Sequence, residues 1–437
     1  QVLQRNRYVL LAERNRVKVV YLAAPRGEIL DREGEILVDS RPGYSVFVSP
    51  EELGDKRRET TLARLSKIVD MDRKEIEERL SMARPNPFEP VKVKRNVGFE
   101  IVSQLAEHRG DLRGVTVKVL PIRRYRYGEE LCHVTGYLGD LVKEELDELH
   151  GKGYKYGDMV GRMGLEQEYE DHLRGKDGVE YLEVDALGME LGTFPERSHI
   201  PEVPGNDLIL TIDLKLQLRA DSLLASKGRG SIVALDPRNG EILALVSRPA
   251  FDPNLLASGI DPEVWLRLKE DPTSPLWDRA TRATYPPGSV FKLFTLASAL
   301  ERGLVPPSSQ LHPCRGGMYI GRRYFGCWKT HGRLDSHQGV VQSCDVYFYQ
   351  IGMRIGLEVL SRDARSYGFG VPTGVDLPRE SPGLLPTPEW YRRNPGRGGG
   401  GVGLAANMAI GQGELLVTPL RLCSLVGAIG VNGTLYR

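Results

Sequence analysis

The stretch Tyr285-Pro286-Pro287-Gly288-Ser289-Val290-Phe291-Lys292 decides how this sequence is interpreted. Its Pro-Pro-Gly segment ends any preceding element. Apolar residues then recur at helical spacing from Val290 to Leu300. The stretch therefore predicts a turn that leads into a largely buried helix, with Ser289 in the first helical turn.

Ser289 and Lys292 are three residues apart, so their side chains share one face of the predicted helix. A serine hydroxyl needs a neighbouring base to act as a nucleophile, and a buried lysine amine can be that base. The helix N-terminus offers free N–H groups to developing negative charge. The alternative is a capping serine and a solvated lysine. Against it, this is the only Ser-x-x-Lys in the chain, and Lys292 lies between two apolar residues.

Composition excludes several classes of protein. The 437 residues carry a formal net charge of +1, with 41% hydrophobic and 27% charged residues, which is ordinary for a globular protein. A near-neutral chain gives no electrostatic case for nucleic acid, and the basic cluster at 123–126 is too small to change that. No apolar run is long enough to span a membrane.

The chain is predicted to be an α+β protein of two parts, with the best boundary at the Pro/Gly-rich residues 201–206. Residues 1–204 form an N-terminal region with a helical insertion at about 50–120, and residues 205–437 form a second domain. Periodicity and turn residues predict these elements: strand 17–22, hairpin 25–38, strand 44–48, helices 57–69, 73–82, 99–108 and 163–175, hairpin 176–192, strand 208–213, helix 214–226 and hairpin 230–246.

Several motifs together resemble the class B penicillin-binding proteins of the elongation type. They are Arg26-Gly27 with Asp31-Arg32-x-Gly34, Gly161-x-x-Gly164-Leu165-Glu166, Ala234-Leu235-Asp236-Pro237, the extended Ser-x-x-Lys motif and Gly411-Gln412-Gly413. The resemblance covers nearly the whole chain. It implies an elongated N-terminal pedestal that carries the helical insertion, followed by a penicillin-binding transpeptidase domain with an antiparallel sheet flanked by helices.

The family's second motif is Ser-x-Asn or Ser-x-Asp, and Ser343-Cys344-Asp345 has that form. Ser343 can relay a proton and hydrogen-bond Lys292, while Asp345 can fix that network. Ser361-Arg362-Asp363 has the same pattern, but the Tyr-Phe-Tyr context after Asp345 and the distance from Ser289 favour Ser343. A helix-capping serine is the structural alternative.

The family's third motif, Lys-Thr-Gly or a close variant, does not occur in the 437 residues. The resemblance places it well after Gly411, so we expect it beyond Arg437, which would leave the transpeptidase domain without its C-terminal strands. A degenerate, inactive domain is the alternative. The resemblance also implies one transmembrane helix before Gln1, anchoring the protein in the cytoplasmic membrane with its domains on the periplasmic side.

Four residues have the spacing of a metal site. Cys314, Cys327, His331 and Cys344 are arranged as C-x12-C-x3-H-x12-C, a Cys3His set of the kind that binds zinc. Some relatives of the elongation type are similar in carrying zinc beside the Ser-x-Asp motif. Buried cysteines without metal, or a Cys314–Cys327 disulfide, are the alternatives, and His312 and His337 are substitute ligands.

The resemblance implies acyl transfer with no cofactor needed for catalysis. Ser289, deprotonated by Lys292, would attack D-Ala-D-Ala of a peptidoglycan stem peptide, and β-lactams would acylate the same serine. A second stem then accepts the acyl group. The family also implies a SEDS-type membrane glycosyltransferase as partner. A β-lactamase or β-lactam sensor of the same fold, or a scaffold that activates the glycosyltransferase, are the competing interpretations.

Overall fold

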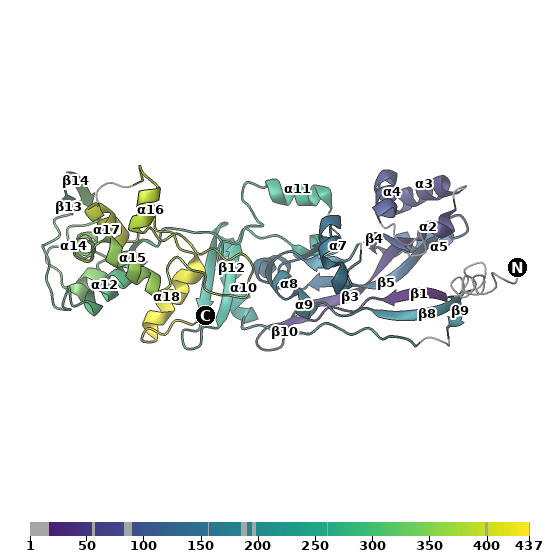
Figure 1. Ribbon diagram of the computed structural model, residues 1–437, viewed down its shortest axis with the longest axis horizontal. Helices are drawn as coiled ribbons and strands as arrows, with labels where there is room; N and C mark the ends of the chain where they lie inside the picture. Colours follow the sequence, from purple (N-terminus) through teal and green to yellow (C-terminus); the bar gives the residue numbers. More distant parts are fainter. Residues whose placement is uncertain are drawn as a thin grey trace, which may run out of the picture. The chain divides into compact units, whose positions relative to one another are not determined.

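The computed structural model describes residues 17–54, 57–82, 90–155, 157–184, 190–194, 198–259, 261–397 and 401–436 (Figure 1). The chain divides into two compact units, each described by itself below. The first contains the residues up to 214 together with 250–272, and the second contains 215–249 together with 273–437. Residues 250–272 thus return to the first unit, which no feature of the sequence had indicated.

The first unit is built on a five-stranded sheet with the order β10-β2-β3-β4, in which β5 also pairs with β3. The long strand β3 can serve several partners because its two ends pair with β2 and β4 in turn, while β5 follows it along its length. The predicted hairpin 25–38 therefore consists of β2 and the first residues of β3, and the predicted strand 44–48 is the last part of the same strand β3. The bounds are β2 Ile29–Leu30, β3 Ile36–Val48, β4 Val91–Val97, β5 Val115–Tyr125 and β10 Leu208–Ile209.

The predicted insertion at about 50–120 forms its own hydrophobic core, but it is not purely helical. Leu62, Leu65 and Leu80 are almost fully buried against strand residues such as Val93. Strand β4 was not predicted, because its alternating lysines and valines between two loops give a weak pattern. The helices here are α2 Pro50–Leu53, α3 Arg58–Val69, α4 Arg73–Met82 and α5 Phe99–Glu107, so three of them match the prediction closely.

The remaining elements of the first unit surround the sheet. Strands β1, β8 and β9 form a second sheet, as the predicted strand 17–22 and hairpin 176–192 require. The predicted helix 163–175 is divided into two short helices at Tyr169. The bounds are β1 Val17–Leu22, β6 Leu138–Asp140, β7 Met159–Gly161, β8 Gly178–Val184, β9 Glu190–Thr193, α6 Cys132–Thr135, α7 Lys143–Leu149, α8 Gly164–Glu168, α9 Glu170–Leu173, η2 Gly128–Glu130, η3 His150–Lys152, η4 Pro253–Leu255 and α11 Pro262–Glu270.

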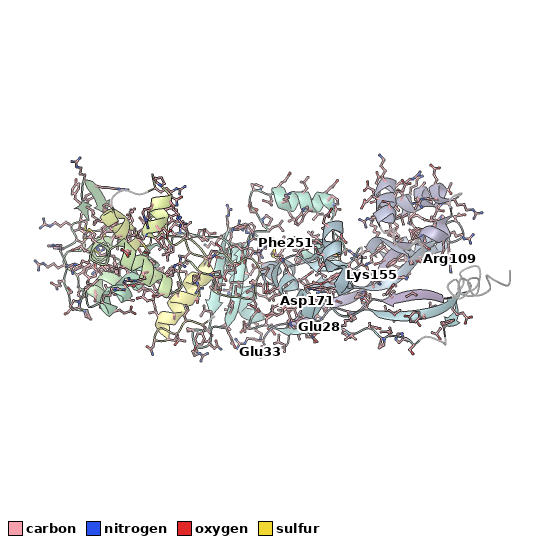
Figure 2. All side chains as sticks on the ribbon, in the orientation of Figure 1. Glu28, Glu33, Arg109, Lys155, Asp171 and Phe251 are labelled. Carbon is pink, nitrogen blue, oxygen red and sulfur yellow. The ribbon has the colours of Figure 1, made fainter. Side chains whose placement is uncertain are left out.

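Phe251 shows why residues 250–272 belong to the first unit. Its side chain, labelled in Figure 2, is only 2% exposed. Its ring makes edge contacts with His133 and Tyr137 at centroid distances of 5.8 Å. The side-chain amide of Asn254 exchanges two hydrogen bonds with the backbone of Tyr125, accepting from its N–H and donating to its carbonyl, each 2.9 Å long. Apolar and polar contacts together hold this segment.

The second unit begins with the predicted helix and hairpin. Strands β11 (Gly230–Leu235) and β12 (Ile242–Arg248) pair antiparallel, and α10 (Leu214–Ala225) is tied to β12 by Gln217, which exchanges hydrogen bonds with the backbone of Leu245. Helix α18 (Pro419–Gly430) packs on the hairpin, because Gly427 leaves room for Leu235. Antiparallel strands covered by helices are the arrangement that the sequence predicted.

A helical core fills the rest of the second unit. Phe291 and Phe294 pack against Phe369 with ring centroids 5.0 Å apart. Helices α14 and α17 approach closely, because Gly352 on α14 has no side chain to separate it from Ala405 on α17. The elements are η5 Gly288–Val290, α12 Phe291–Glu301, β13 Gly317–Ile320, β14 Arg323–Gly326, α13 Ser336–Val341, α14 Asp345–Ile355, α15 Leu357–Ser366, α16 Pro388–Arg393 and α17 Gly401–Ala409. In the described part of the chain no helix has both the length and the apolar character needed to cross a bilayer.

Candidate active site

Ser289 lies in the short 3-10 turn η5, directly before helix α12. Its side chain is exposed, whereas Phe291 and Lys292 are 0% and 2% exposed. The helix thus begins one residue later than the periodicity indicated. The turn exposes the Ser289 hydroxyl to solvent at the N-terminus of a largely buried helix. A nucleophile must be accessible to its substrate in this way.

The segment after Gly411 holds this turn in place. The backbone N–H of Gly288 donates to the Gly411 carbonyl at 3.0 Å, and Tyr285 and Val417 exchange two backbone hydrogen bonds of 2.9 Å. A Cβ on Gly411 would lie 2.1 Å from the Gly288 carbonyl oxygen, so the close approach requires glycine. This contact explains why Gly411-Gln412-Gly413 accompanies the Ser-x-x-Lys motif.

Lys292 meets the second predicted motif. Its Nζ donates to the Ser343 carbonyl at 2.8 Å, to Ser343 Oγ at 3.0 Å and to Asp345 Oδ1 at 2.6 Å. Three acceptors match the three N–H donors of a lysine ammonium group. An ammonium formed when Lys292 accepts a proton would therefore be stabilised on the spot.

The structure distinguishes between the two Ser-x-Asp sequences. Ser361 and Asp363 lie in α15, where Ser361 Oγ bonds a backbone carbonyl and Asp363 accepts from Ser298 and Arg302. The hydrogen bonds of Lys292 Nζ go to Ser343 and Asp345, and neither Ser361 nor Asp363 is among its partners in the described part of the chain. The context argument for Ser343 thus agrees with the contacts, and Asp363 has a structural role.

Trp328 is a neighbour of this network that the sequence did not suggest. Its indole Nε1 donates to the Ser343 carbonyl at 3.2 Å, the same oxygen that accepts from Lys292. The side chain is 67% exposed. A tryptophan beside Cys327 carries no recognisable pattern, so only the contact reveals it.

Tyr349 is close enough to Asp345 for the carboxylate charge to affect the pKa of its hydroxyl. Burial, together with the negative charge of Asp345, raises the pKa of Tyr349 to about 12. Its hydroxyl donates to the Gly326 carbonyl at 3.1 Å. Tyr349 is therefore a neutral donor that ties α14 to strand β14, and not a proton carrier.

The four predicted metal ligands come together in the structure. One ligand atom from each of Cys314, Cys327, His331 and Cys344 lies within 4.8 Å of all the others, although the residues are distant in sequence. Paired backbone bonds between Cys314 and Gly332 close the loop, and Cys344 directly precedes α14. All five cysteines of the chain are free thiols, and the described cluster includes neither His312 nor His337.

The cluster has the donor atoms of a zinc site, and one pair of these atoms has the spacing that zinc requires. A tetrahedral site with ordinary Zn–S and Zn–N bonds separates its ligand atoms by about 3.5–3.8 Å. The Cys327 sulfur and His331 Nδ1 are 3.6 Å apart. His331 Nε2 is buried without a hydrogen-bond partner among the described residues. Cys344 lies between Ser343 and Asp345, so the cluster directly supports the lysine network.

Comparison with known proteins shows the family of the chain. The Penicillin-binding Protein dimerisation domain model matches residues 21–210, and the Penicillin binding protein transpeptidase domain model matches residues 230–437. Peptidoglycan D,D-transpeptidase MrdA of Acinetobacter baumannii is 33% identical over 99% of this chain and 64% of its own length. The Escherichia coli K12 MrdA is 34% identical over 97% of this chain and 67% of its own length. The chain thus spans about two thirds of these relatives.

Solved structures give the same result. The Helicobacter pylori penicillin-binding protein PBP2, in a complex with MreC, superposes with a TM-score of 0.81 at 30% identity, covering 95% of this chain and 77% of that chain. Pseudomonas aeruginosa PBP2 in complex with WCK 5153 gives a TM-score of 0.67 at 25% identity, over 94% and 70%. The predicted family and fold class are confirmed. This chain belongs to the class B penicillin-binding proteins of the elongation type, with a dimerisation domain followed by a transpeptidase domain.

Proposed function

We propose that the protein is a serine D,D-transpeptidase that cross-links peptidoglycan stem peptides. One observation carries this proposal: Ser343 and Asp345 both accept hydrogen bonds from Lys292 Nζ. Lys292 lies at the start of a helix, and the exposed Ser289 directly precedes that helix. The relatives named peptidoglycan D,D-transpeptidase support the substrate class. No cofactor is needed for the chemistry.

In the proposed reaction, neutral Lys292 takes the proton of Ser289 as the hydroxyl oxygen attacks the carbonyl of D-Ala-D-Ala. The backbone N–H of Ser289 stabilises the oxyanion. The C–N bond then breaks, the Lys292 proton passes to the leaving amine, and D-Ala departs. An amine of a second stem attacks the resulting ester and gives up a proton to Lys292. The ester C–O bond breaks, the proton passes from Lys292 to Ser289 Oγ, and a new amide is left. Asp345 and Ser343 stabilise the charged lysine between these steps.

Labelling with a fluorescent penicillin tests this mechanism in the full-length protein. The wild type should form a stable adduct, Ser289→Ala should form none, and Lys292→Ala should acylate slower by about 10²–10⁴-fold, because the base is lost. Ser308→Ala, at another exposed serine of the same unit, is the control. Labelling that survives Ser289→Ala would refute the proposal. Turnover of penicillin would favour a β-lactamase.

We also propose that Cys314, Cys327, His331 and Cys344 hold a structural zinc ion. Elemental analysis of the purified full-length protein should give about one zinc per chain. Cys327→Ser should lose the metal and lower the melting temperature, whereas Cys423→Ser, outside the cluster, should retain it. A trace amount of zinc in the wild type would contradict this proposal.

Substrate chemistry also suggests where the protein works and with which partner. Uncross-linked peptidoglycan lies outside the cytoplasmic membrane, so we propose that both domains are extracytoplasmic, anchored by a transmembrane segment outside residues 1–437. A SEDS-type glycosyltransferase would contact the dimerisation domain, including residues 50–120. Deletion of this block should abolish activation of the polymerase and leave penicillin labelling intact. Unchanged activation would argue against this contact.

A further inference from the structure

A cavity of about 130 Å³ lies within the first unit, apart from the candidate active site. Its lining is rich in positive charge, since five basic side chains contribute to it and only two acidic ones, Asp158 and Asp177. Small or apolar residues such as Ala24 and Ile122 complete the wall. The basic residues are Arg26, Lys92, Arg95, Arg123 and Arg174.

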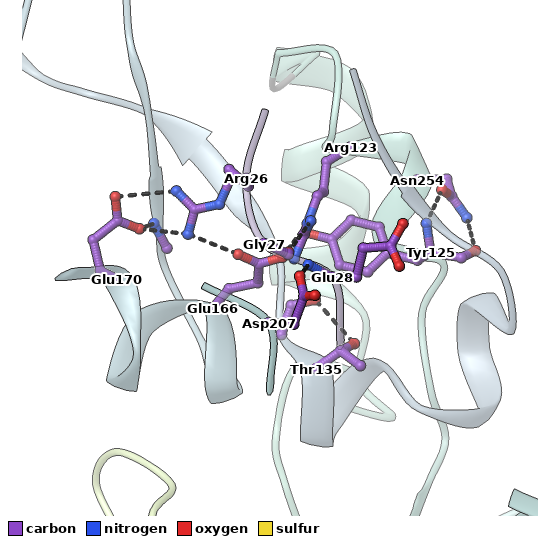
Figure 3. A network of polar contacts seen from close by, with 12 residues as sticks. Arg26, Gly27, Glu28, Arg123, Tyr125, Thr135, Glu166, Glu170, Asp207 and Asn254 are labelled. Atoms are coloured by element: carbon purple, nitrogen blue, oxygen red, sulfur yellow. Dashed lines mark hydrogen bonds and ion pairs between the residues drawn. The ribbon is translucent and has the colours of Figure 1, made fainter. Parts of the chain in front are cut away.

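Two of these arginines form ion pairs with Glu166, which is fully buried, and with Glu170, which is 17% exposed (Figure 3). Arg26 pairs with Glu166 and Glu170 at 2.8 Å, and Arg123 pairs with Glu166 at 2.6 Å. Glu166 is fully buried, and burial alone would raise its pKa, but the charges of Arg123 and Arg26 outweigh this effect and lower it. The guanidinium groups are therefore rigidly oriented and charged.

These pairs do not satisfy every donor of the two arginines. Arg26 Nε and Arg123 Nη2 are buried and have no hydrogen-bond partner in the described part of the chain. The Arg123 side chain is 1% exposed and that of Arg26 is 11% exposed. A buried donor without an acceptor is unfavourable, so both arginines that line the cavity keep a hydrogen-bonding capacity that the described part of the chain does not use.

Lys92 adds a positive charge that no carboxylate neutralises directly. Its Nζ donates to the Gly157 carbonyl at 3.2 Å, and no described carboxylate lies within ion-pair distance of it. Burial and the charge of Arg95 together lower the pKa of Lys92 to about 7, against the opposing charges of Asp158, Asp140 and Asp177. A bound anion would offset this unfavourable environment.

The other two basic residues have partners at the edge of the cavity. Arg95 pairs with Asp140 at 2.6 Å, and Arg174 with Asp158 at 3.3 Å. In a purely structural network every N–H group would have an acceptor. Arg26, Lys92 and Arg123 each keep N–H groups without an acceptor among the described residues, and these groups could donate to an anion.

We propose that this cavity is a binding site for a phosphate-sized oxyanion, held by Arg26, Lys92 and Arg123. Planar guanidinium groups match the geometry of phosphate oxygens, and an ammonium adds charge without a fixed direction. The volume accommodates several water molecules, which is enough for one tetrahedral anion. The shared chemistry is a phosphate, either free in solution or in a lipid headgroup. The site does not depend on Ser289 or on the proposed transpeptidase reaction.

Calorimetric titration of the full-length protein with inorganic phosphate and with pyrophosphate tests the site. The wild type should bind, and Lys92→Met should bind at least ten-fold more weakly. Lys94→Met is the matched control: Lys94 is on the same strand, but its Nζ donates to the backbone of Asp70, so affinity should change less than two-fold. Both variants should keep the penicillin labelling of the wild type.

Phosphate should also raise the melting temperature of the wild type and not that of a folded Lys92→Met variant, which keeps the test valid if calorimetric heats are small. Flotation with phosphatidylglycerol vesicles, against phosphatidylcholine vesicles, identifies the source of the phosphate. Headgroup binding requires capture that is lost in Lys92→Met, and free-anion binding requires soluble phosphate alone to bind. If neither phosphate, pyrophosphate nor vesicles bind, or if Lys92→Met binds as the wild type does, the inference is wrong.

Discussion

At the scale of single residues, the site depends on the backbone of Ser343. This residue has a φ of 49°, in the left-handed region that non-glycine residues adopt only at a cost. That conformation accompanies a carbonyl that accepts from both Lys292 and Trp328. The two hydrogen bonds stabilise a backbone geometry that would otherwise be unfavourable, and they fix where the lysine amine lies.

Replacing Trp328 by phenylalanine should therefore slow acylation. The ring is kept but the N–H donor is lost, so the Ser343 carbonyl is held by Lys292 alone. We expect the second-order rate of penicillin acylation to fall about three- to ten-fold, with a changed pH profile, because the base is less firmly positioned. Trp277→Phe, at an exposed tryptophan that stacks on Arg282, should change neither quantity. Equal rates in Trp328→Phe and wild type would contradict a positioning role.

At the scale of elements, strand pairing places charges that the sequence shows only as a basic cluster. Asp39 on β3 lies opposite Arg124 on β5 and accepts from both Arg124 and Arg126. Hydrogen bonds from Arg124 lower the pKa of Asp39 to about 2, with a further contribution from Arg126. The cluster at 123–126 thus serves the sheet, and nothing in it requires nucleic acid.

Asp39→Asn should lower the stability of the first unit in a pH-dependent way. A lowered pKa gives stability that is present above the unfolded pKa, near 4, and is lost as the pH falls towards 2. The shift corresponds to about 2 kcal/mol, and solvent screening at the half-exposed Arg124 reduces the expected loss at pH 7 to ~1 kcal/mol. Hydrogen exchange in β3 and β5 under urea measures it. Asp171→Asn, at an exposed carboxylate, is the control; a difference that persists at pH 2 would contradict the argument.

Gly411→Ala should displace the Ser289 turn. Both the close contact with the Gly288 carbonyl and a φ of 69° oppose a side chain at this position. We expect penicillin acylation to slow at least ten-fold, since small displacements of a nucleophile are costly. Gly303→Ala has a similar φ of 64° with nothing within 4 Å, so it tests backbone strain without the contact. Equal rates for both variants would exclude the contact as the cause.

At the scale of the whole molecule, the chain enters the second unit, returns to the first for residues 250–272 and then completes the second. Local patterns cannot reveal such a return, because the turn residues around it resemble those of any loop. What fixes the segment is burial of Phe251 and hydrogen bonding by Asn254, and both involve residues more than a hundred positions earlier in the chain.

Phe251→Ala should therefore destabilise the first unit and not the second. Removing a buried phenylalanine costs about 3–4 kcal/mol. Hydrogen exchange should accelerate in residues 132–139 and stay unchanged in α12. Phe99→Ala removes a ring that is 71% exposed in the same unit, and should have little effect. Accelerated exchange in α12 would show that the segment supports the second unit instead.

The sequence alone determined the features that depend on neighbouring residues. The Ser289 turn, the helix after it and most hairpins follow from apolar periodicity and turn residues, which act over a few positions. The family followed from several such motifs in order. The spacing of Cys314, Cys327, His331 and Cys344 likewise predicted a cluster that the structure assembles.

Only the tertiary structure decided which distant groups meet. It brought Ser343 and not Ser361 to Lys292, placed Trp328 on the same carbonyl, and surrounded one cavity with basic residues from four separate parts of the first unit. The context along the chain favoured Ser343 over Ser361, but only packing decides which of them contacts Lys292, because periodicity records which face of an element is buried and not what it is buried against. Packing of α12 against α14 and the pairing of β3 with β5 supply that information.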